Sequence, residues 1–164
     1  MKYRAFISYK HAVSREFAEN LELALKAYAK PLWHPPIAIF RDEKYLRAGL
    51  DLPQMIKDAL DQSEFLIYIA SPEAAASSWV QDELMHWCSR LSRLEKLIII
   101  LTDGRIAIDE SSKAIDWENT NAVPTPLRQF LASVPLYLDG SLFDVLARQT
   151  GAGDFLAELA CFAG

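Results

Sequence analysis

The sequence has few cysteines and no surplus of positive charge, and each of these features excludes some classes of function. Its 164 residues include two cysteines, Cys88 and Cys161, which lie too far apart for a metal-binding pair and are too few for a disulfide framework. Seventeen basic residues stand against 22 acidic ones, giving a net charge of −5, so a nucleic-acid backbone is not expected as the main partner. We therefore expect a protein of a reducing compartment, the cytoplasm.

Long hydrophobic runs are missing as well. The longest, Phe65–Ala70 and Leu97–Leu101, are far shorter than the roughly 20 apolar residues that cross a bilayer, so no membrane span is expected. Met1 leads directly into a strand-like segment and not into the apolar core of a signal peptide. The length fits one domain, 1–164. Because its last residues are apolar, we expect this domain to be part of a longer protein.

Short apolar strands alternate with amphipathic helices along the chain. The three clearest strands are apolar at nearly every position, which is typical of parallel strands covered on both faces. The strand candidates are Tyr3–Ser8, Ile37–Phe40, Phe65–Ala70, Leu97–Leu101 and Pro135–Leu138. The helix candidates are Ser14–Lys30, Pro53–Gln62, Ser78–Arg93 and Ser141–Phe162.

Local signals set the expected ends of these helices. Ser14 is a plausible cap for the first helix, and Ser78 and Gln81 have the spacing of a capping box. The polar segment Thr102–Pro126 is expected to be a long loop with a short helix after Pro124. The alternation predicts a doubly wound α/β fold, a flavodoxin-like five-stranded parallel sheet in the order 2-1-3-4-5 flanked by helices.

The usual chemical signatures of such folds are absent from the sequence. The first strand runs into Ser8-Tyr9-Lys10-His11 without a glycine, which excludes a dinucleotide turn and a P-loop. The third strand ends without an aspartate to accept a phosphoryl group, and no Gly-x-Ser-x-Gly elbow occurs. His86 lies four residues after Asp82 and two before Cys88, but no further ligands converge there in the sequence, so no metal site is expected.

Unusual polar segments follow the first three strands. In open α/β sheets, ligands bind beyond the carboxyl ends of strands, where the direction of winding reverses. In the expected strand order, that place lies between the first and third strands. The segments that map there are Ser8 to His11, the loop from Arg41 to Gly49, and Ser71-Pro72 leading to Ser77–Leu84.

These segments resemble TIR (Toll/interleukin-1 receptor) domains of the bacterial, NAD-consuming type. Phe6-Ile7-Ser8-Tyr9 is similar to the motif that opens TIR domains, and the stretch from Phe40 to Gly49 is similar to their BB loop. Ser71-Pro72 followed by Trp79-x-x-x-Glu83 is similar to their third-strand end and catalytic helix. The resemblance covers roughly the first hundred residues.

The resemblance implies an enzyme that cleaves the nicotinamide–ribose bond of NAD⁺, as a glycohydrolase or a cyclase. It implies activation by self-association through the loop from Arg41 to Gly49, and a place in bacterial immune, antiphage or stress signalling. NAD⁺ is then a substrate, and no cofactor or metal is expected.

The resemblance makes Glu83 the catalytic carboxylate, four residues after Trp79 and thus on the same helix face. Nicotinamide is already cationic in NAD⁺ and leaves as a neutral base, so no general acid is needed, unlike in ordinary glycosidases. One fixed anion then stabilises the oxocarbenium-like ribose. The open alternative is an exposed acidic residue favoured by the helix dipole. Asp82 points elsewhere and is the natural control.

The resemblance also implies substrate-binding residues, and simpler roles stay open for several of them. The set is Ser8, Tyr9, Lys10, His11, Arg41, Gly49, Leu50, Ser71 and Trp79. Ser8 alternatively satisfies backbone groups, Lys10 and His11 are alternatively solvated charges, and Trp79 alternatively packs in the core.

Two arginines flank the loop that follows the second strand. Arg41 and Arg47 either bind phosphate or pair with Asp42 and Glu43, and pairing is favoured for Arg47. Both roles stay open for Arg41.

Two other functions remain as alternatives. A TIR domain that only associates with other TIR domains, as an adaptor, has the same anatomy but no need for Glu83. An unrelated flavodoxin-like binding module has no reason to carry the three motifs. Because Glu83 stands in register with Trp79, the enzyme is favoured.

Overall fold

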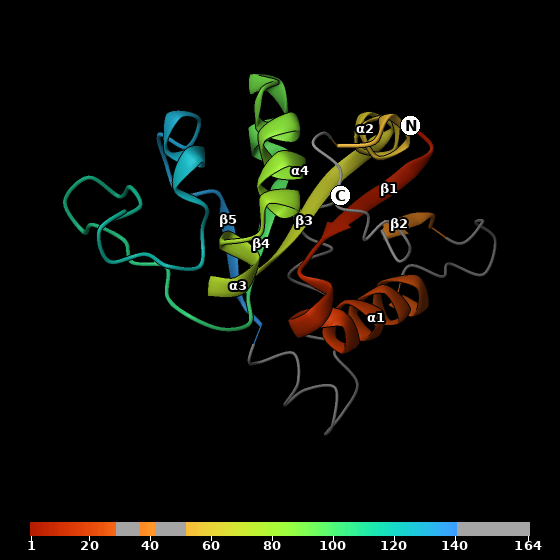
Figure 1. Ribbon diagram of the computed structural model, residues 1–164, viewed down its shortest axis with the longest axis horizontal. Coiled ribbons are helices and arrows are strands. Elements are labelled where there is room, and N and C mark those ends of the chain that lie inside the picture. The colour runs from red at the N-terminus through yellow and green to blue at the C-terminus, as the bar shows by residue number, and fades with distance from the viewer. Residues whose placement is uncertain (29–36, 42–51, 141–164) are drawn as a thin grey trace.

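Five parallel strands form one sheet at the centre of the molecule (Figure 1). The computed structural model describes residues 1–28, 37–41 and 52–140. The sheet order is β2-β1-β3-β4-β5, and all neighbouring strands are parallel. The strands are β1 (Tyr3–Ser8), β2 (Ile39–Arg41), β3 (Ser63–Ala70), β4 (Leu97–Leu101) and β5 (Leu136–Asp139). The predicted flavodoxin-like α/β fold is confirmed.

Each connection between parallel strands must return from the carboxyl end of one strand to the amino end of the next. The helices in these connections cover both faces of the sheet. In Figure 1, α1 lies on one side of the sheet, and α2 and α4 lie on the opposite side. The described α-helices are α1 (His11–Tyr28), α2 (Gln54–Asp61), α3 (Pro72–Ala75) and α4 (Ser78–Cys88). Two 3₁₀ helices cover Leu91–Lys96 and Thr125–Gln129.

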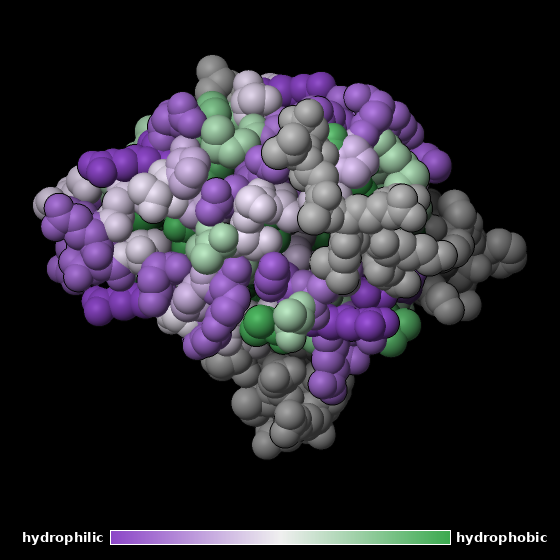
Figure 2. Space-filling model, in the orientation of Figure 1, coloured by the Kyte–Doolittle hydropathy of each residue, from purple (hydrophilic) through white to green (hydrophobic). Residues whose placement is uncertain are grey.

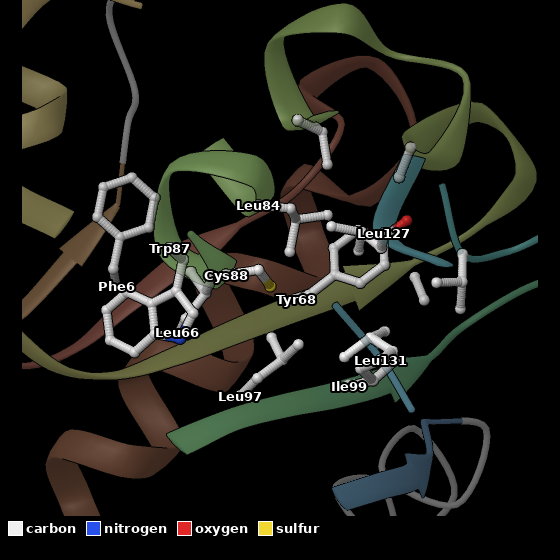
Figure 3. Packing of buried hydrophobic residues seen from close by; sticks show 14 of the residues in the cluster. Phe6, Leu66, Tyr68, Leu84, Trp87, Cys88, Leu97, Ile99, Leu127 and Leu131 are labelled. Atoms are coloured by element: carbon white, nitrogen blue, oxygen red, sulfur yellow. The ribbon is translucent and has the colours of Figure 1, made fainter. Parts of the chain in front are cut away.

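Alternating side chains of the strands form two separate cores. Phe6 of β1 points into the first core, whereas its neighbour Ile7 points into the second. In the first core, drawn in Figure 3, Leu66 of β3 packs with Trp87 of α4. In the second core, the strands pack against Leu21 of α1. The central strands are therefore buried on both faces, which explains why their sequences are apolar at nearly every position.

Backbone pairing extends three strands beyond the apolar residues that predicted them. β2 continues to Arg41 because Arg41 pairs with Ile7 of β1, and β5 continues to Asp139 because Asp139 pairs with Leu101 of β4. β3 begins two residues early, at Ser63. The hydroxyl of this buried serine donates to a carbonyl of α2 at 2.7 Å, so a polar residue fits there.

The predicted cap of the first helix is wrong. α1 begins at His11, because the amides of Val13 and Ser14 both donate to the carbonyl of Lys10, at 3.1 and 2.9 Å. Ser14 lies inside this helix, at a kink where φ is −113° and ψ is 18°. Its side chain is buried and caps nothing.

The helix that carries Trp79 and Glu83 starts as predicted but is shorter. α4 begins at Ser78 with Ser77 as its N-cap residue, so the predicted capping pair of Ser78 and Gln81 is wrong. The Gln81 amide donates instead to the carbonyl of Ala75, at 2.7 Å, and thereby ties α4 to α3. α4 ends at Cys88, and a separate 3₁₀ helix follows at Leu91–Lys96.

The long loop after β4 contacts β3 through Tyr68 and α3 through Pro72. The buried hydroxyl of Tyr68 donates to the carbonyl of Ala122 at 2.9 Å. Gly104 has a φ of +83°, and a Cβ there would lie 2.8 Å from the ring of Pro72. The predicted loop and the short helix after Pro124 are confirmed. The predicted helix from Ser141 to Phe162 lies outside the described residues.

Polar side chains cover most of the face shown in Figure 2, with smaller apolar areas between them. Large apolar residues such as Val13 and Leu23 are exposed on α1. None of the helices in the described part of the chain is long and apolar enough to cross a membrane.

Candidate active site

The ends of β1 and β3 and the first turns of α4 meet at one edge of the sheet. Ser8, the last residue of β1, pairs with Tyr68 of β3 and is 1% exposed. Because α4 follows β3 after a short connection, its N-terminus begins at the carboxyl edge of the sheet. Lys10, just beyond β1, confirms the proximity, since its Nζ lies 3.5 Å from Oγ of Ser77, the N-cap residue of α4.

Glu83 occupies the interior of this edge, on the second turn of α4. It is 2% exposed. The Ser8 hydroxyl donates to its Oε2 at 2.5 Å, and the Trp79 indole N–H donates to its Oε1 at 3.0 Å. Each carboxylate oxygen therefore receives a hydrogen bond, and the two donors come from different elements. These bonds offset part of the cost of burying a carboxylate and fix the plane of the group.

The interpretation of Glu83 as an exposed surface residue is wrong. A glutamate favoured only by the helix dipole stays in water, whereas Glu83 is nearly inaccessible and hydrogen-bonded through both oxygens. Its neighbour Asp82 is exposed, as the sequence predicted. The two adjacent carboxylates thus differ in burial, which makes Asp82 a matched control for substitutions of Glu83.

Trp79 combines the two roles considered for it. Its ring is partly buried and packs against the core that contains Phe6 and Val80. At the same time its Nε1 donates to Glu83, as the spacing of four residues on one helix face allows. The indole therefore forms both part of the core boundary and one side of the site.

A network of aromatic and charged groups joins β1, β2 and α1 beside this edge. The Tyr9 ring stacks on His11, with centroids 4.5 Å apart, and its hydroxyl accepts a hydrogen bond from Arg41 Nη1 at 3.1 Å. Arg41 Nε lies 2.8 Å from Glu22 Oε2, and Arg41 Nη1 lies 3.4 Å from Glu19 Oε1. The guanidinium of Arg41 thus connects the end of β2 to α1 and to the residue that follows Ser8.

Glu22 is ionised in this network despite its partial burial. Burial opposes ionisation, but hydrogen bonds from Lys26 and Arg41 outweigh it and hold the pKa of Glu22 below its ordinary value. Lys26 Nζ lies 2.5 Å from Glu22 Oε1, so each carboxylate oxygen faces a cation. The partners that α1 supplies to Arg41 are therefore stabilised in their charged form.

Ser71 has a structural role at the end of β3. Its buried Oγ accepts a hydrogen bond from the amide of Ala74 at 3.1 Å and caps α3, with Pro72 in the first turn. A substrate contact by Ser71 stays a prediction. The remaining residues predicted for the loop after β2 lie outside the described part of the chain, namely Asp42, Glu43, Arg47, Gly49 and Leu50.

Comparison with known proteins assigns this fold and site to a family. A family model described as "TIR domain" matches residues 5–131, which is most of the chain. The chain belongs to the TIR domain family.

A curated relative and a solved structure are similar to this TIR domain. The relative, named "NAD(+) hydrolase ApTIR" and found in Actinoplanes sp., is 43% identical over 141 residues, covering 85% of this chain and 19% of the relative. The domain thus spans about a fifth of that relative's length. The TIR domains in the structure of the activated Roq1 resistosome, which directly recognises the pathogen effector XopQ, are 23% identical, with a TM-score of 0.47. That match covers 68% of this chain and 61% of the other.

The far end of α4 is anchored to α2 by a second ionic group of the TIR domain. His86 Nε2 lies 2.9 Å from Asp61 Oδ1, and Arg90 Nη2 lies 2.8 Å from Asp61 Oδ2. Burial opposes ionisation of Asp61, but the hydrogen bonds from His86 and Arg90 outweigh it and lower its pKa. Within residues 1–28, 37–41 and 52–140, no group of three or more His, Cys, Asp or Glu side chains is placed to hold a metal ion. The contacts of His86 and Arg90 with Asp61 join the end of α4 to α2.

Sequence reasoning missed the acidic partners that α1 supplies to Arg41, and it missed Ser77. Glu19 and Glu22 are three residues apart and so share a helix face, which is the signal that marks them as a possible pair. That face meets Arg41 only because α1 packs beside β2, a relation that no local pattern indicates.

Proposed function

We propose that this TIR domain cleaves the bond between nicotinamide and ribose in NAD⁺, with Glu83 as the catalytic carboxylate. The observation that carries the proposal is the buried Glu83 carboxylate, oriented by Ser8 and Trp79 at the carboxyl edge of the sheet. This is the edge where α/β sheets bind ligands. The relative that is 43% identical is named an NAD(+) hydrolase, which supports the same activity here.

One carboxylate is enough for this reaction. The bond between ribose C1′ and the nicotinamide nitrogen breaks, its electron pair passes to the nitrogen, and nicotinamide leaves as a neutral base. The positive charge moves onto C1′ and the ring oxygen of the ribose, where the Glu83 anion stabilises it. Water then adds to C1′ and loses a proton, which gives ADP-ribose. Attack on C1′ by an adenine nitrogen of the same molecule gives a cyclic product instead.

Residues around Glu83 supply the proposed contacts with the rest of the substrate. Trp79 forms an apolar wall beside the reacting ribose, and Lys10 places its cation near the N-terminus of α4. The Lys10 cation and the positive N-terminal end of α4 both favour an anionic pyrophosphate at this point. The other proposed contacts are Tyr9, His11, Arg41, Gly49, Leu50 and Ser71.

Self-association is proposed to control the activity. In this proposal the loop from Arg41 to Gly49 contacts a second copy of the domain and completes its site. The activity serves bacterial immune, antiphage or stress signalling in the cytoplasm. Specific activity then rises steeply with protein concentration, and a specific activity that is constant over a wide concentration range argues against control by assembly.

The test compares two neighbouring carboxylates of opposite burial. NAD⁺ consumption is measured by chromatography of NAD⁺ and its products, at high protein concentration. The three purified proteins compared are the wild-type domain, Glu83→Gln and Asp82→Asn. Glu83→Gln keeps the size of the side chain but removes its charge and replaces one acceptor oxygen by an amide donor, so turnover should fall by about 10²–10³. Asp82→Asn removes the same charge one residue away and should retain wild-type turnover.

The same experiment distinguishes the enzyme from an adaptor. Equal turnover by Glu83→Gln and the wild type rules out Glu83 as the catalytic carboxylate. If none of the three proteins consumes NAD⁺, even when crowded or assembled, the domain is a TIR–TIR association module.

A further inference from the structure

We infer that Ser8 is a positioning residue that sets the orientation of the Glu83 carboxylate, and that it does not bind the substrate. This inference rests on the proposed function. Its structural basis is the hydrogen bond from Ser8 Oγ to Glu83 Oε2, which joins residues 75 positions apart in the chain.

Ser8 belongs to an interior strand of the sheet. β1 lies between β2 and β3, and Ser8 itself pairs with Tyr68 in the ladder to β3. The preceding residue, Ile7, pairs with both neighbouring strands, through Arg41 on one side and Ile67 on the other. The backbone that carries the Ser8 hydroxyl is therefore fixed from both sides of the strand.

The hydrogen bonds that Ser8 and Trp79 donate to Glu83 have different structural consequences. Trp79 belongs to the same helix as Glu83, so its bond fixes the carboxylate relative to α4. Ser8 belongs to β1, so its bond fixes the carboxylate relative to the sheet edge. A substrate bound at that edge meets a correctly oriented carboxylate only if the position of Glu83 relative to the sheet is maintained.

The Ser8 hydroxyl is poorly suited to bind the substrate itself. A serine hydroxyl has one proton, and Ser8 already donates it to Glu83. Ser8 therefore acts on the reaction through Glu83.

Kinetics of four variants test this role. Ser8→Ala should lower kcat roughly 10- to 100-fold, the range expected for one hydrogen bond to a charged group, with KM nearly unchanged. Ser8→Thr and Ser8→Val add the same volume and differ in the hydroxyl, so Thr should retain much more activity than Val. In the Glu83→Gln background, Ser8→Ala should cause no further loss, because the two residues act as one unit.

Each alternative has a distinct result. A raised KM with an unchanged kcat in Ser8→Ala identifies Ser8 as a substrate ligand and overturns the inference. Wild-type kinetics in Ser8→Ala, equal activity of the Thr and Val variants, or a further loss in the Glu83→Gln background also overturn it. If Ser8→Ala does not fold, as thermal unfolding shows, the Thr and Val pair decides. Absence of NAD⁺ turnover in the wild type instead overturns the proposed function itself, separately from any effect confined to Ser8.

Discussion

Replacing Arg41 by methionine should destabilise the domain, because Arg41 connects β2 to α1 through a largely buried ion pair. Arg41 Nε lies 2.8 Å from Glu22 Oε2, and the two side chains are 8% and 15% exposed. Water screens such a pair weakly compared with a surface salt bridge. Methionine preserves most of the aliphatic stem but removes this partner of Glu22 and the hydrogen bond that the Tyr9 hydroxyl accepts from Arg41.

The expected loss follows from the bonds removed. A hydrogen bond to a charged group contributes about 1.5–3 kcal/mol, so Arg41→Met should lower the free energy of unfolding by about 2–3 kcal/mol. For a domain of this size, 1 kcal/mol lowers the melting temperature by about 2–4 °C, which gives a total of about 4–12 °C. In a double-mutant cycle, Arg41→Met and Glu22→Gln should show a coupling of at least about 1 kcal/mol.

Urea denaturation, followed by circular dichroism, measures these changes. Arg15→Met is the control, because Arg15 is 69% exposed and water screens its pair with Glu19 on the helix surface, so this substitution should leave the urea midpoint nearly unchanged. Equal urea midpoints for Arg41→Met and Arg15→Met would refute the reasoning. An unchanged midpoint combined with a raised KM for NAD⁺ would show that Arg41 binds substrate phosphate instead of supporting the fold.

Two further predictions concern acid stability and the loop after β4. Because the folded-state pKa of Glu22 lies below its ordinary value of 4.5, its stabilising contribution is present above that pH and is lost as pH falls through the lowered pKa. Urea midpoints should therefore fall less steeply below about pH 4.5 in Glu22→Gln than in the wild type, and parallel curves would contradict this. Tyr68→Phe should cost about 1–3 kcal/mol, since it leaves the buried carbonyl of Ala122 without its hydroxyl donor. Tyr137→Phe, at a partly buried tyrosine of β5, is its control, and equal thermal unfolding of the two variants would contradict the role of the Tyr68 hydroxyl.

Much of the fold was predictable because the central strands are buried on both faces. The apolar runs at Tyr3–Ser8 and Leu97–Leu101 have the bounds that the sequence predicted, since short runs of this kind between helices favour covered parallel strands. The start of α1 was not predictable from Ser14. A serine just before a helical pattern is a common cap, but here the chain already turns at Lys10, whose carbonyl accepts the first helical bonds.

The candidate site was predictable to the extent that it depends on helix spacing and strand order. Trp79 and Glu83 share a face because they are four residues apart, and Ser8 lies near them because β1 and β3 are neighbours. The burial of Glu83 was not predictable, since the same spacing occurs on exposed helices. The glutamates that bind Arg41 were also hidden, because their meeting depends on how α1 packs and not on any sequence pattern.

The hydrogen bond between Ser8 and Glu83 determines when, during synthesis of the chain, the Glu83 carboxylate can become oriented. One partner is in the first strand and the other lies 75 residues later, beyond the third strand. A ribosome must therefore complete about half of the domain before both ends of this contact exist. Prematurely terminated chains that stop before α4, and nicked chains in which β1 has separated from the sheet, lack an oriented carboxylate. Whatever reaction Glu83 serves is thereby confined to chains in which the first strand and the fourth helix have already docked.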